Sequence, residues 1–251
     1  TGDEGPLLGG IPLSNVRVSE AQLHYTDRSS GQAFRLDLDA QLGILPEGQA
    51  LASDGTVDLR TVRALLPDVG PDTLRVRDAQ LRYDVRVAPS AGTVEVQALR
   101  LDTAPFTLTA NGSLAGLNER PTVELGFETG DTDLAQIASF VPAAAVEGLN
   151  PQGTLSLKGS VTGALPSEGS VLDSLTIAAT GALAEAGVDY QGRALLRSVS
   201  ADLALSLDEV AARSIQGQIL GASLTGAVAV RELGATPQID LDLQTGAMNL
   251  P

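Results

Sequence analysis

Repetition at a fixed spacing is the feature of this sequence that most restricts its fold. The segment VRVSEAQLHY at residues 16–25 recurs as LRVRDAQLRY at residues 74–83, 58 positions later. PTVELGFETGDTDL at residues 121–134 recurs as PQIDLDLQTGAMNL at residues 237–250, 116 positions later and thus at twice that spacing. Such repeats build proteins whose modules stack side by side and bury their apolar faces against one another. We therefore expect residues 1–251 to form one continuous unit with an extended surface.

Apolar and polar residues alternate over most of the sequence. The runs FRLDLD at residues 34–39 and VELGFE at residues 123–128 are examples. A period of two residues is typical of a β-strand with one face in water. Segments rich in Gly, Pro and Asn separate the runs and predict antiparallel hairpins. Asn111-Gly112 is interpreted as one such turn, although with Ser113 it also fits the acceptor pattern for N-glycosylation.

Two segments depart from the alternation in the same way and are predicted to be short helices. They are DLRTVRALLP at residues 58–67 and DLAQIASFVP at residues 133–142. Both have apolar residues at i, i+3 and i+7, which would share one face of a two-turn helix. Asp58 and Asp133 are placed to cap these helices, and the prolines would end them. The predicted fold class is therefore mainly β, an elongated and curved antiparallel sheet with two short helices.

The composition narrows the range of ligands and partners. The 31 acidic and 16 basic residues give a net charge of −15, which would repel a phosphate backbone, so no nucleic-acid partner is expected. Cysteine is absent, which removes disulfides and thiol catalysis. Apolar residues make up 43% of the chain but aromatic residues only 3%. Such aliphatic surfaces favour flexible acyl chains, although Leu and Val also build ordinary two-sheet cores.

No group of side chains indicates catalysis or metal binding. His24 is the only histidine, and the alternation places it on the exposed side of a strand. Three pairs of aspartates resemble parts of a calcium site: Asp37 with Asp39, Asp131 with Asp133, and Asp240 with Asp242. None is followed by the further ligands that such a site needs. We expect no enzyme, cofactor or metal; a glycan-acting enzyme using Asp37 and Asp39 is kept as an alternative.

The order and spacing of these elements resemble those of the AsmA-like proteins, a bacterial envelope family related in architecture to repeating-β-groove lipid transporters. The resemblance covers nearly the whole chain. It rests on residues 16–43 (VRVSEAQLHYTDRSSGQAFRLDLDAQLG), on the segment at residues 58–67, on residues 106–134 (FTLTANGSLAGLNERPTVELGFETGDTDL) and on residues 210–230 (VAARSIQGQILGASLTGAVAV).

The resemblance implies a taco-shaped sheet with an apolar trough that carries phospholipid between the inner and outer membranes. It also implies a periplasmic location and an N-terminal membrane anchor. We expect this chain to be a central fragment of such an inner-membrane-anchored protein, contacting both membranes through segments outside it. The sequence carries no indication of an oligomeric state.

The apolar positions of the strands are the candidate lipid-binding residues, with phospholipid or another acyl lipid as the ligand. They are Val16, Val18, Leu23, Phe34, Leu36, Leu38, Leu81, Phe106, Leu108, Val123, Leu125, Phe127, Leu155, Leu157, Ile239, Leu241 and Leu243. The alternative is a non-catalytic structural or assembly protein of the envelope, which acts through protein contacts and whose sheet closes over a dry core.

Overall fold

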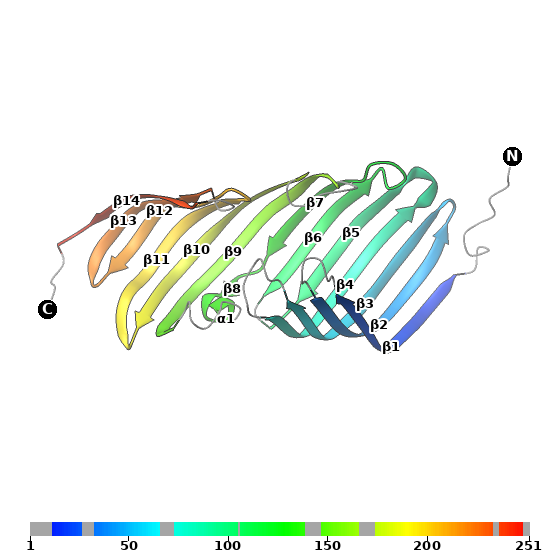
Figure 1. Cartoon of the computed structure of the whole chain (residues 1–251), viewed down its shortest axis with the longest axis horizontal. Helices are drawn as coiled ribbons and strands as arrows, with labels where there is room; N and C mark the ends of the chain where they lie inside the picture. Colours follow the sequence, from blue (N-terminus) through cyan, green and yellow to red (C-terminus); the bar gives the residue numbers. More distant parts are fainter. Residues whose placement is uncertain are drawn as a thin grey trace. The chain divides into compact units, whose positions relative to one another are not determined.

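The computed structural model describes residues 12–26, 33–65, 73–104, 106–138, 147–165, 174–232 and 236–247. Most of these residues lie in strands (Figure 1). The strands are β1 (Leu13–Thr26), β2 (Ala33–Glu47), β3 (Ala50–Leu65), β4 (Thr73–Ala88), β5 (Thr93–Asp102), β6 (Thr107–Ala115), β7 (Thr122–Thr129), β8 (Thr132–Asp133), β9 (Leu149–Ala164), β10 (Leu175–Tyr190), β11 (Arg193–Ser206), β12 (Glu209–Ile219), β13 (Ala222–Arg231) and β14 (Gln238–Thr245). The helical elements are the 3-10 turn η1 (Pro89–Ala91) and the helix α1 (Leu134–Ala138).

The strands belong to one sheet in which neighbours in the chain are neighbours in space. The order runs from β1 to β7 and from β9 to β14, and β8 pairs with β9 beside this path. The pairs with a defined register are antiparallel. The order begins at β1 and ends at β14, so the sheet of the described strands does not close on itself. The predicted antiparallel, mainly β fold is confirmed.

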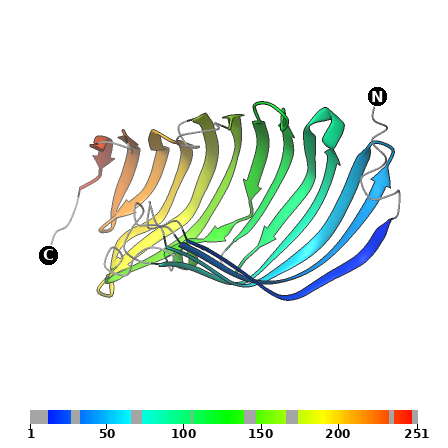
Figure 2. The same cartoon turned by 45° about the vertical axis from the view of Figure 1, so that its right-hand side comes forward.

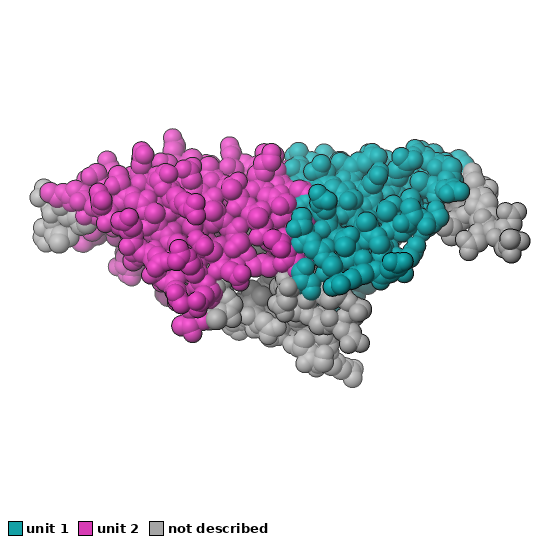
Figure 3. All heavy atoms as spheres, turned by 90° about the horizontal axis from the view of Figure 1, so that it is seen from above, with its two compact units in different colours: residues 1–104, 108–125, 162–174 teal, residues 105–107, 126–161, 175–251 magenta. Residues whose placement is uncertain are grey.

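The chain divides into two compact units (Figure 3). Unit 1 consists of Thr1–Ala104, Leu108–Leu125 and Thr162–Ser174, and unit 2 consists of Pro105–Thr107, Gly126–Val161 and Leu175–Pro251. Unit 1 contains β1 to β5, and unit 2 contains α1 and β10 to β14. That residues 1–251 form a single continuous fragment of a longer protein stays a prediction.

In unit 1 the strand register sorts apolar and polar side chains onto opposite faces. Residues directly opposite each other on neighbouring strands point to the same side of a sheet. One row across β1 to β5 consists of Val18, Ala40, Val57, Leu81 and Leu101. The row beside it, on the other side, consists of Arg17, Gln41, Thr56, Arg82 and Arg100. We call these sides the apolar face and the polar face.

Unit 2 is sorted in the same manner. A row on its apolar face consists of Gly181, Leu203, Ala212, Val228 and Leu241, one residue from each of β10 to β14. A row on its polar face consists of Ser200, Gln216, Thr225 and Gln244. Each unit therefore has a sheet with one aliphatic side and one hydrophilic side.

Long strands in both units contain β-bulges at which two apolar residues lie three positions apart. Register shifts fall between Val18 and Ala21 in β1, Leu183 and Ala186 in β10, and Ala212 and Ile215 in β12. The third residue of each segment has a positive φ: Glu20 at 56°, Glu185 at 52° and Ser214 at 52°. The extra residue of a bulge shifts the alternation by one. Apolar residues at i and i+3 can therefore stay on the same face of the strand.

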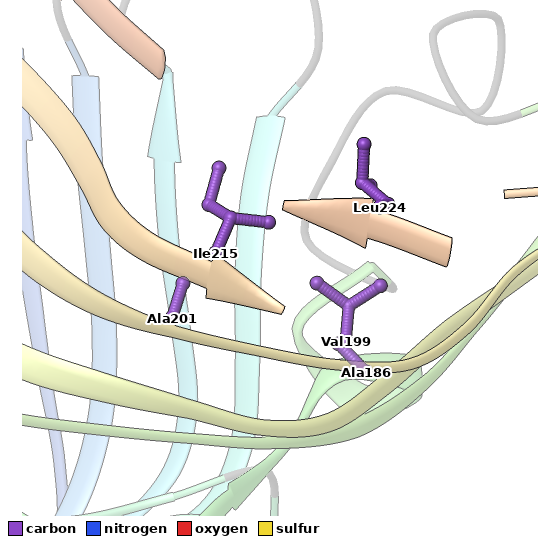
Figure 4. Close-up of a cluster of buried hydrophobic side chains, with 5 residues drawn as sticks. All are labelled: Ala186, Val199, Ala201, Ile215 and Leu224. Carbon is purple, nitrogen blue, oxygen red and sulfur yellow. The ribbon is translucent and has the colours of Figure 1, made fainter. Parts of the chain in front are cut away.

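The bulges of unit 2 lie on consecutive strands and bend the sheet toward its apolar face. Ser198 of β11 also has a positive φ, 48°, between the bulged residues of β10 and β12. Bulges bend a strand and increase its local twist. The residues that follow them, Ala186, Val199 and Ile215, are 8%, 7% and 7% exposed. Figure 4 shows these side chains on the inner side of the curving strands.

Unit 1 also contains residues with positive φ at the bends of its strands. Asp78 of β4 has a φ of 54°, and Ala79 after it is only 3% exposed. Figure 2 shows that β1 to β4 bend along their length. Glu20 and Asp78 precede an apolar-face alanine just as Glu185 does in unit 2. Because bulged and apolar positions are related in the same way in both units, the sheet of unit 1 also bends toward its apolar face.

The predicted helix at residues 58–67 is wrong, because residues 58–65 belong to β3. A register shift explains the error: Leu59 pairs with Leu38 and Val62 pairs with Leu36, while Asp37 pairs with Thr61. The extra residue between Leu59 and Val62 gives a strand the i, i+3 spacing of a helix. Asp58 caps nothing here, and its Oδ1 accepts a hydrogen bond from Gln80 Nε2 at 2.8 Å.

The helix predicted at residues 133–142 is confirmed over Leu134–Ala138, and residues 139–142 lie outside the described residues. Asp133 acts as the expected cap, since its Oδ1 accepts a hydrogen bond from Ala135 N at 2.8 Å. In the part of the chain that the structure describes, no helix combines the length and apolar character needed to span a membrane.

The turn predicted at Asn111-Gly112 is wrong, because both residues lie inside β6. Gly112 has a φ of 147°, and a Cβ there would lie 2.0 Å from the carbonyl oxygen of Glu124. Glycine is required by this close approach of two strands rather than by a reversal of the chain.

Candidate functional site

The apolar face of unit 1 brings together the predicted residues of its first four strands. Leu23 pairs with Leu36, and Ala21 pairs with Leu38. Val16 and Val18 of β1 and Leu81 of β4 lie in the neighbouring rows, and Phe34 lies opposite Tyr25. The rings of Tyr25 and Phe34 are tilted with centroids 6.1 Å apart. These seven predicted residues therefore share one face, whereas their binding of lipid stays a prediction.

Two glycines identify the face of the predicted residues on β7 and β9. A Cβ at Gly159 would lie 2.7 Å from both Phe127 Cζ and Ala179 Cβ. A Cβ at Gly181 would lie 2.6 Å from Leu157 Cδ2. Because Gly181 and Ala179 both lie on the apolar face of β10, Phe127 and Leu157 lie on that face as well. Alternation then gives the same side to the remaining predicted residues of these strands, Val123, Leu125 and Leu155.

On β6, the half-buried Leu108 alternates with the exposed Thr109 and Asn111, the pattern of an apolar-side residue. Phe106 is half-buried and comes just before β6. Ile239, Leu241 and Leu243 of β14 pair with Val230, Val228 and Gly226 on the apolar face.

The apolar face is largely exposed on the first and last strands, β1 and β14. Leu23 on β1 is 60% exposed, and Ile239 and Leu241 on β14 are 63% and 65% exposed. Between these strands most aliphatic side chains are half-buried, and none of the large apolar side chains in the described residues is fully enclosed. A sheet normally covers its apolar side with a second layer. Here one aliphatic side remains accessible over much of each unit.

Ion pairs occupy the polar face of both units. The N–O distances are 2.8 Å between Arg100 and Asp102 and 2.7 Å between Arg231 and Asp240. Arg197 and Asp189 are 3.6 Å apart. Exposed pairs of this kind each contribute about 0–1 kcal/mol to stability. Their main effect is to keep the polar face hydrated.

Asp39 links three strands at the bend of unit 1. Its Oδ1 accepts a hydrogen bond from Arg60 and another, at 2.7 Å, from the backbone N–H of the bulge residue Glu20. The Arg60 guanidinium, and next the Glu20 amide, hold the pKa of Asp39 below its usual value. The carboxylate thus satisfies an amide that the bulge removes from the ladder.

Both aspartates considered for catalysis lie near an arginine. Asp37 Oδ1 lies 3.6 Å from Arg35 Nε, while Asp39 is engaged by Arg60. His24 lies opposite Arg35 on the polar face. The described residues contain no group of three or more His, Asp or Glu side chains arranged to hold a metal ion. Nothing in this arrangement provides a nucleophile with its base.

The prediction missed several residues of the apolar face, and a third copy of the first repeat. EAGVDY at residues 185–190 matches EAQLHY at residues 20–25 and DAQLRY at residues 78–83. Searching for an acidic residue followed by Ala, an aliphatic residue and Tyr at these spacings would have found it. The aliphatic residues of the apolar face that the prediction did not select include Leu59, Val62, Leu183, Val199, Ile215 and Leu224.

Comparisons of the chain with protein-family models, with curated proteins and with solved structures found no match.

Proposed function

We propose that this protein binds the acyl chains of phospholipids along the apolar face and conducts them between membranes, as the resemblance to AsmA-like proteins implies. The proposed setting is the periplasm, with the membranes reached through segments outside this chain. No bond is made or broken in this function. Aliphatic side chains supply the binding energy, and the charged polar face keeps the sheet in solution.

The observation that carries this proposal is that each unit has an aliphatic face with incomplete cover. Full burial of one Leu, Val or Ile side chain is worth about 1.5–3 kcal/mol. Leaving many of them partly wet is a large cost for a protein whose net stability is about 5–15 kcal/mol. A hydrocarbon tail lying on the face would recover this free energy without requiring any hydrogen bond.

The structural alternative needs a dry core between two sheets. The strands that the structure describes form a single sheet, and no second sheet lies among them to cover the apolar face. This favours an apolar ligand over a closed sandwich. A partner protein that covers the same face is the outcome that the following experiment separates.

The test is organic extraction of gently purified protein, followed by mass spectrometry of the lipids and a transfer assay between vesicles. Wild-type protein should carry phospholipid and accelerate its transfer. Leu38→Asp on β2 should lower both, because a carboxylate on the apolar face opposes a hydrocarbon. Leu45→Asp is the matched control, since Leu45 lies on the same strand, points to the polar face and is 51% exposed.

Val18→Asp provides a second variant on the apolar face if Leu38→Asp fails to fold, because Val18 is 39% exposed and lies on an edge strand. Circular dichroism establishes that each variant retains its strands. Wild-type protein that carries no lipid and transfers none would refute the proposal. Equal lipid content in Leu45→Asp and the two apolar-face variants would refute it as well.

A further inference from the structure

The bend of unit 2 is filled by the protein's own side chains. Its buried cluster consists of Ala186, Val199, Ala201, Ile215 and Leu224 (Figure 4). Leu134 of α1 packs against this cluster, so the helix lies on the apolar face of unit 2. Val199 also closes a gap between strands, because a Cβ at Gly217 would lie 2.7 Å from Val199 Cγ2. Side chains and helix together leave this part of the face buried.

The corresponding bend of unit 1 has a different lining. Ala21 and Ala79 follow its bulged residues, where unit 2 has Ala186, Val199 and Ile215. The leucines between them, Leu38 and Leu59, are half-buried. In the described part of unit 1, the only buried apolar side chains belong to Ala50, Ala79 and Val123, and no Leu, Ile, Phe or Tyr is buried. Among the described residues, the helix α1 belongs to unit 2.

The side chains on the apolar face of unit 1 indicate what kind of ligand it can bind. The described rows that cross β1 to β5 on this face carry no charged side chain. Their polar side-chain groups are the hydroxyls of Tyr25, Ser53 and Tyr83, and the last two lie 3.5 Å from each other. Such a surface offers dispersion contacts and almost no hydrogen bonds. It fits the hydrocarbon tail of a lipid and offers nothing to a charged headgroup.

Resting on the function proposed above, we infer that the two units are not equivalent along the lipid path: acyl tails occupy the bend of unit 1, and the filled bend of unit 2 excludes them. Ala79 is then a specificity-determining residue, because it lies 3% exposed under the lining of the unit 1 bend, and a larger side chain there would push that lining toward the bound tail. In unit 2 the cluster around Val199 and Ile215 takes the place that a tail occupies in unit 1.

Photo-crosslinking of the wild-type chain tests this inference. The probe is phosphatidylcholine with a diazirine in one acyl chain, presented in vesicles, and labelled residues are identified by mass spectrometry. Label should appear at Leu38, Leu59 and Leu81 of unit 1 and be absent from the buried cluster of unit 2. Label on Val199, Ile215 or Leu224 at the level of unit 1 would overturn the inference while supporting lipid binding. Absence of label throughout the chain would overturn the proposed function itself.

A pair of variants provides a second measurement. Ala79→Leu adds bulk to the floor of the unit 1 bend, and Ala98→Leu makes the same change on the polar face, where Ala98 pairs with Asp84 and is exposed. If the new side chain displaces one methylene of a bound tail, about 0.8 kcal/mol, the affinity for the probe lipid should fall about fourfold. Ala98→Leu should leave it unchanged. Equal affinities in the two folded variants would refute the role of Ala79.

Discussion

Glu185 provides the most direct test of how this sheet bends. Its side chain is exposed, and its backbone has a φ of 52° at the bulge of β10. An L-residue in the left-handed region costs about 1–2 kcal/mol. Glu185→Gly removes this cost but loses about 0.5–1 kcal/mol to the greater freedom of glycine in the unfolded chain. The net effect on the free energy of unfolding should therefore lie between about zero and 1.5 kcal/mol of stabilisation.

Glu185→Val should have a clearly different result. A β-branched residue is a strong outlier at positive φ, whereas valine is favoured in ordinary strand positions. We expect this variant to be less stable than Glu185→Gly by about 1 kcal/mol, because the left-handed penalty, which is largest for β-branched residues, exceeds the entropic cost of glycine. Ala184→Val is the matched control, because Ala184 is the preceding exposed residue and is not among the described residues with positive φ. Its effect should stay within about 0.5 kcal/mol.

Urea unfolding followed by circular dichroism measures these differences, provided that the slope of the free energy against urea is unchanged between variants. If Glu185→Val and Glu185→Gly unfold at the same urea concentration, the backbone conformation at the bulge is not what stabilises the bend. If Ala184→Val is as damaging as Glu185→Val, the effect of valine is steric and has no connection with φ.

Three further predictions concern the hydrogen-bonded carboxylate of Asp39, the buried cluster of unit 2 and the cap of α1. Asp39→Asn should lower the melting temperature at pH 7, and the difference from wild type should shrink below about pH 4, the unfolded-state pKa. The Arg60 hydrogen bond lowers the folded-state pKa of Asp39, so its contribution is present above the unfolded pKa and is lost as pH falls through the folded pKa. Leu224→Ala, at 7% exposure, should cost about 2–4 kcal/mol in chemical unfolding, whereas Leu241→Ala, at 65% exposure, should cost under about 1 kcal/mol. Asp133→Ala should cost about 1 kcal/mol by removing the α1 cap, seen as faster amide exchange over Leu134–Ala138.

The alternation of the sequence was sufficient to predict strands and to select one face. It succeeds at residues such as Leu36, Leu38 and Leu241 because a strand places every second side chain on the same side, whatever its neighbours are. Register with the adjacent strands then brings these residues together on the apolar face. The cap at Asp133 was also predictable, because it depends only on residues close in sequence.

The misassigned segments share a physical cause, which is that they depend on a neighbouring strand. Leu59 and Val62 have the spacing of a helix only because an extra residue lies between them opposite β2. Asn111-Gly112 has the composition of a turn, but Gly112 is needed where the backbone of β7 comes close. The filling of the unit 2 bend likewise depends on the packing of Leu134 against strands that follow it in the chain. Local sequence patterns contain none of this information.

The β-bulges with an acidic or serine residue at positive φ explain how the strands bend and still keep their apolar residues on one face. A long strand can bend sharply by inserting a residue, but in a strictly alternating sequence the insertion would turn every later apolar side chain to the opposite side. The chain avoids this at Glu20, Glu185 and Ser214 by placing apolar residues three positions apart across each insertion. The aliphatic face therefore continues through the bend without a polar interruption. In unit 2 this continuity brings together the side chains of the buried cluster, and in unit 1 it leaves the uncharged surface on which we propose that a lipid tail lies.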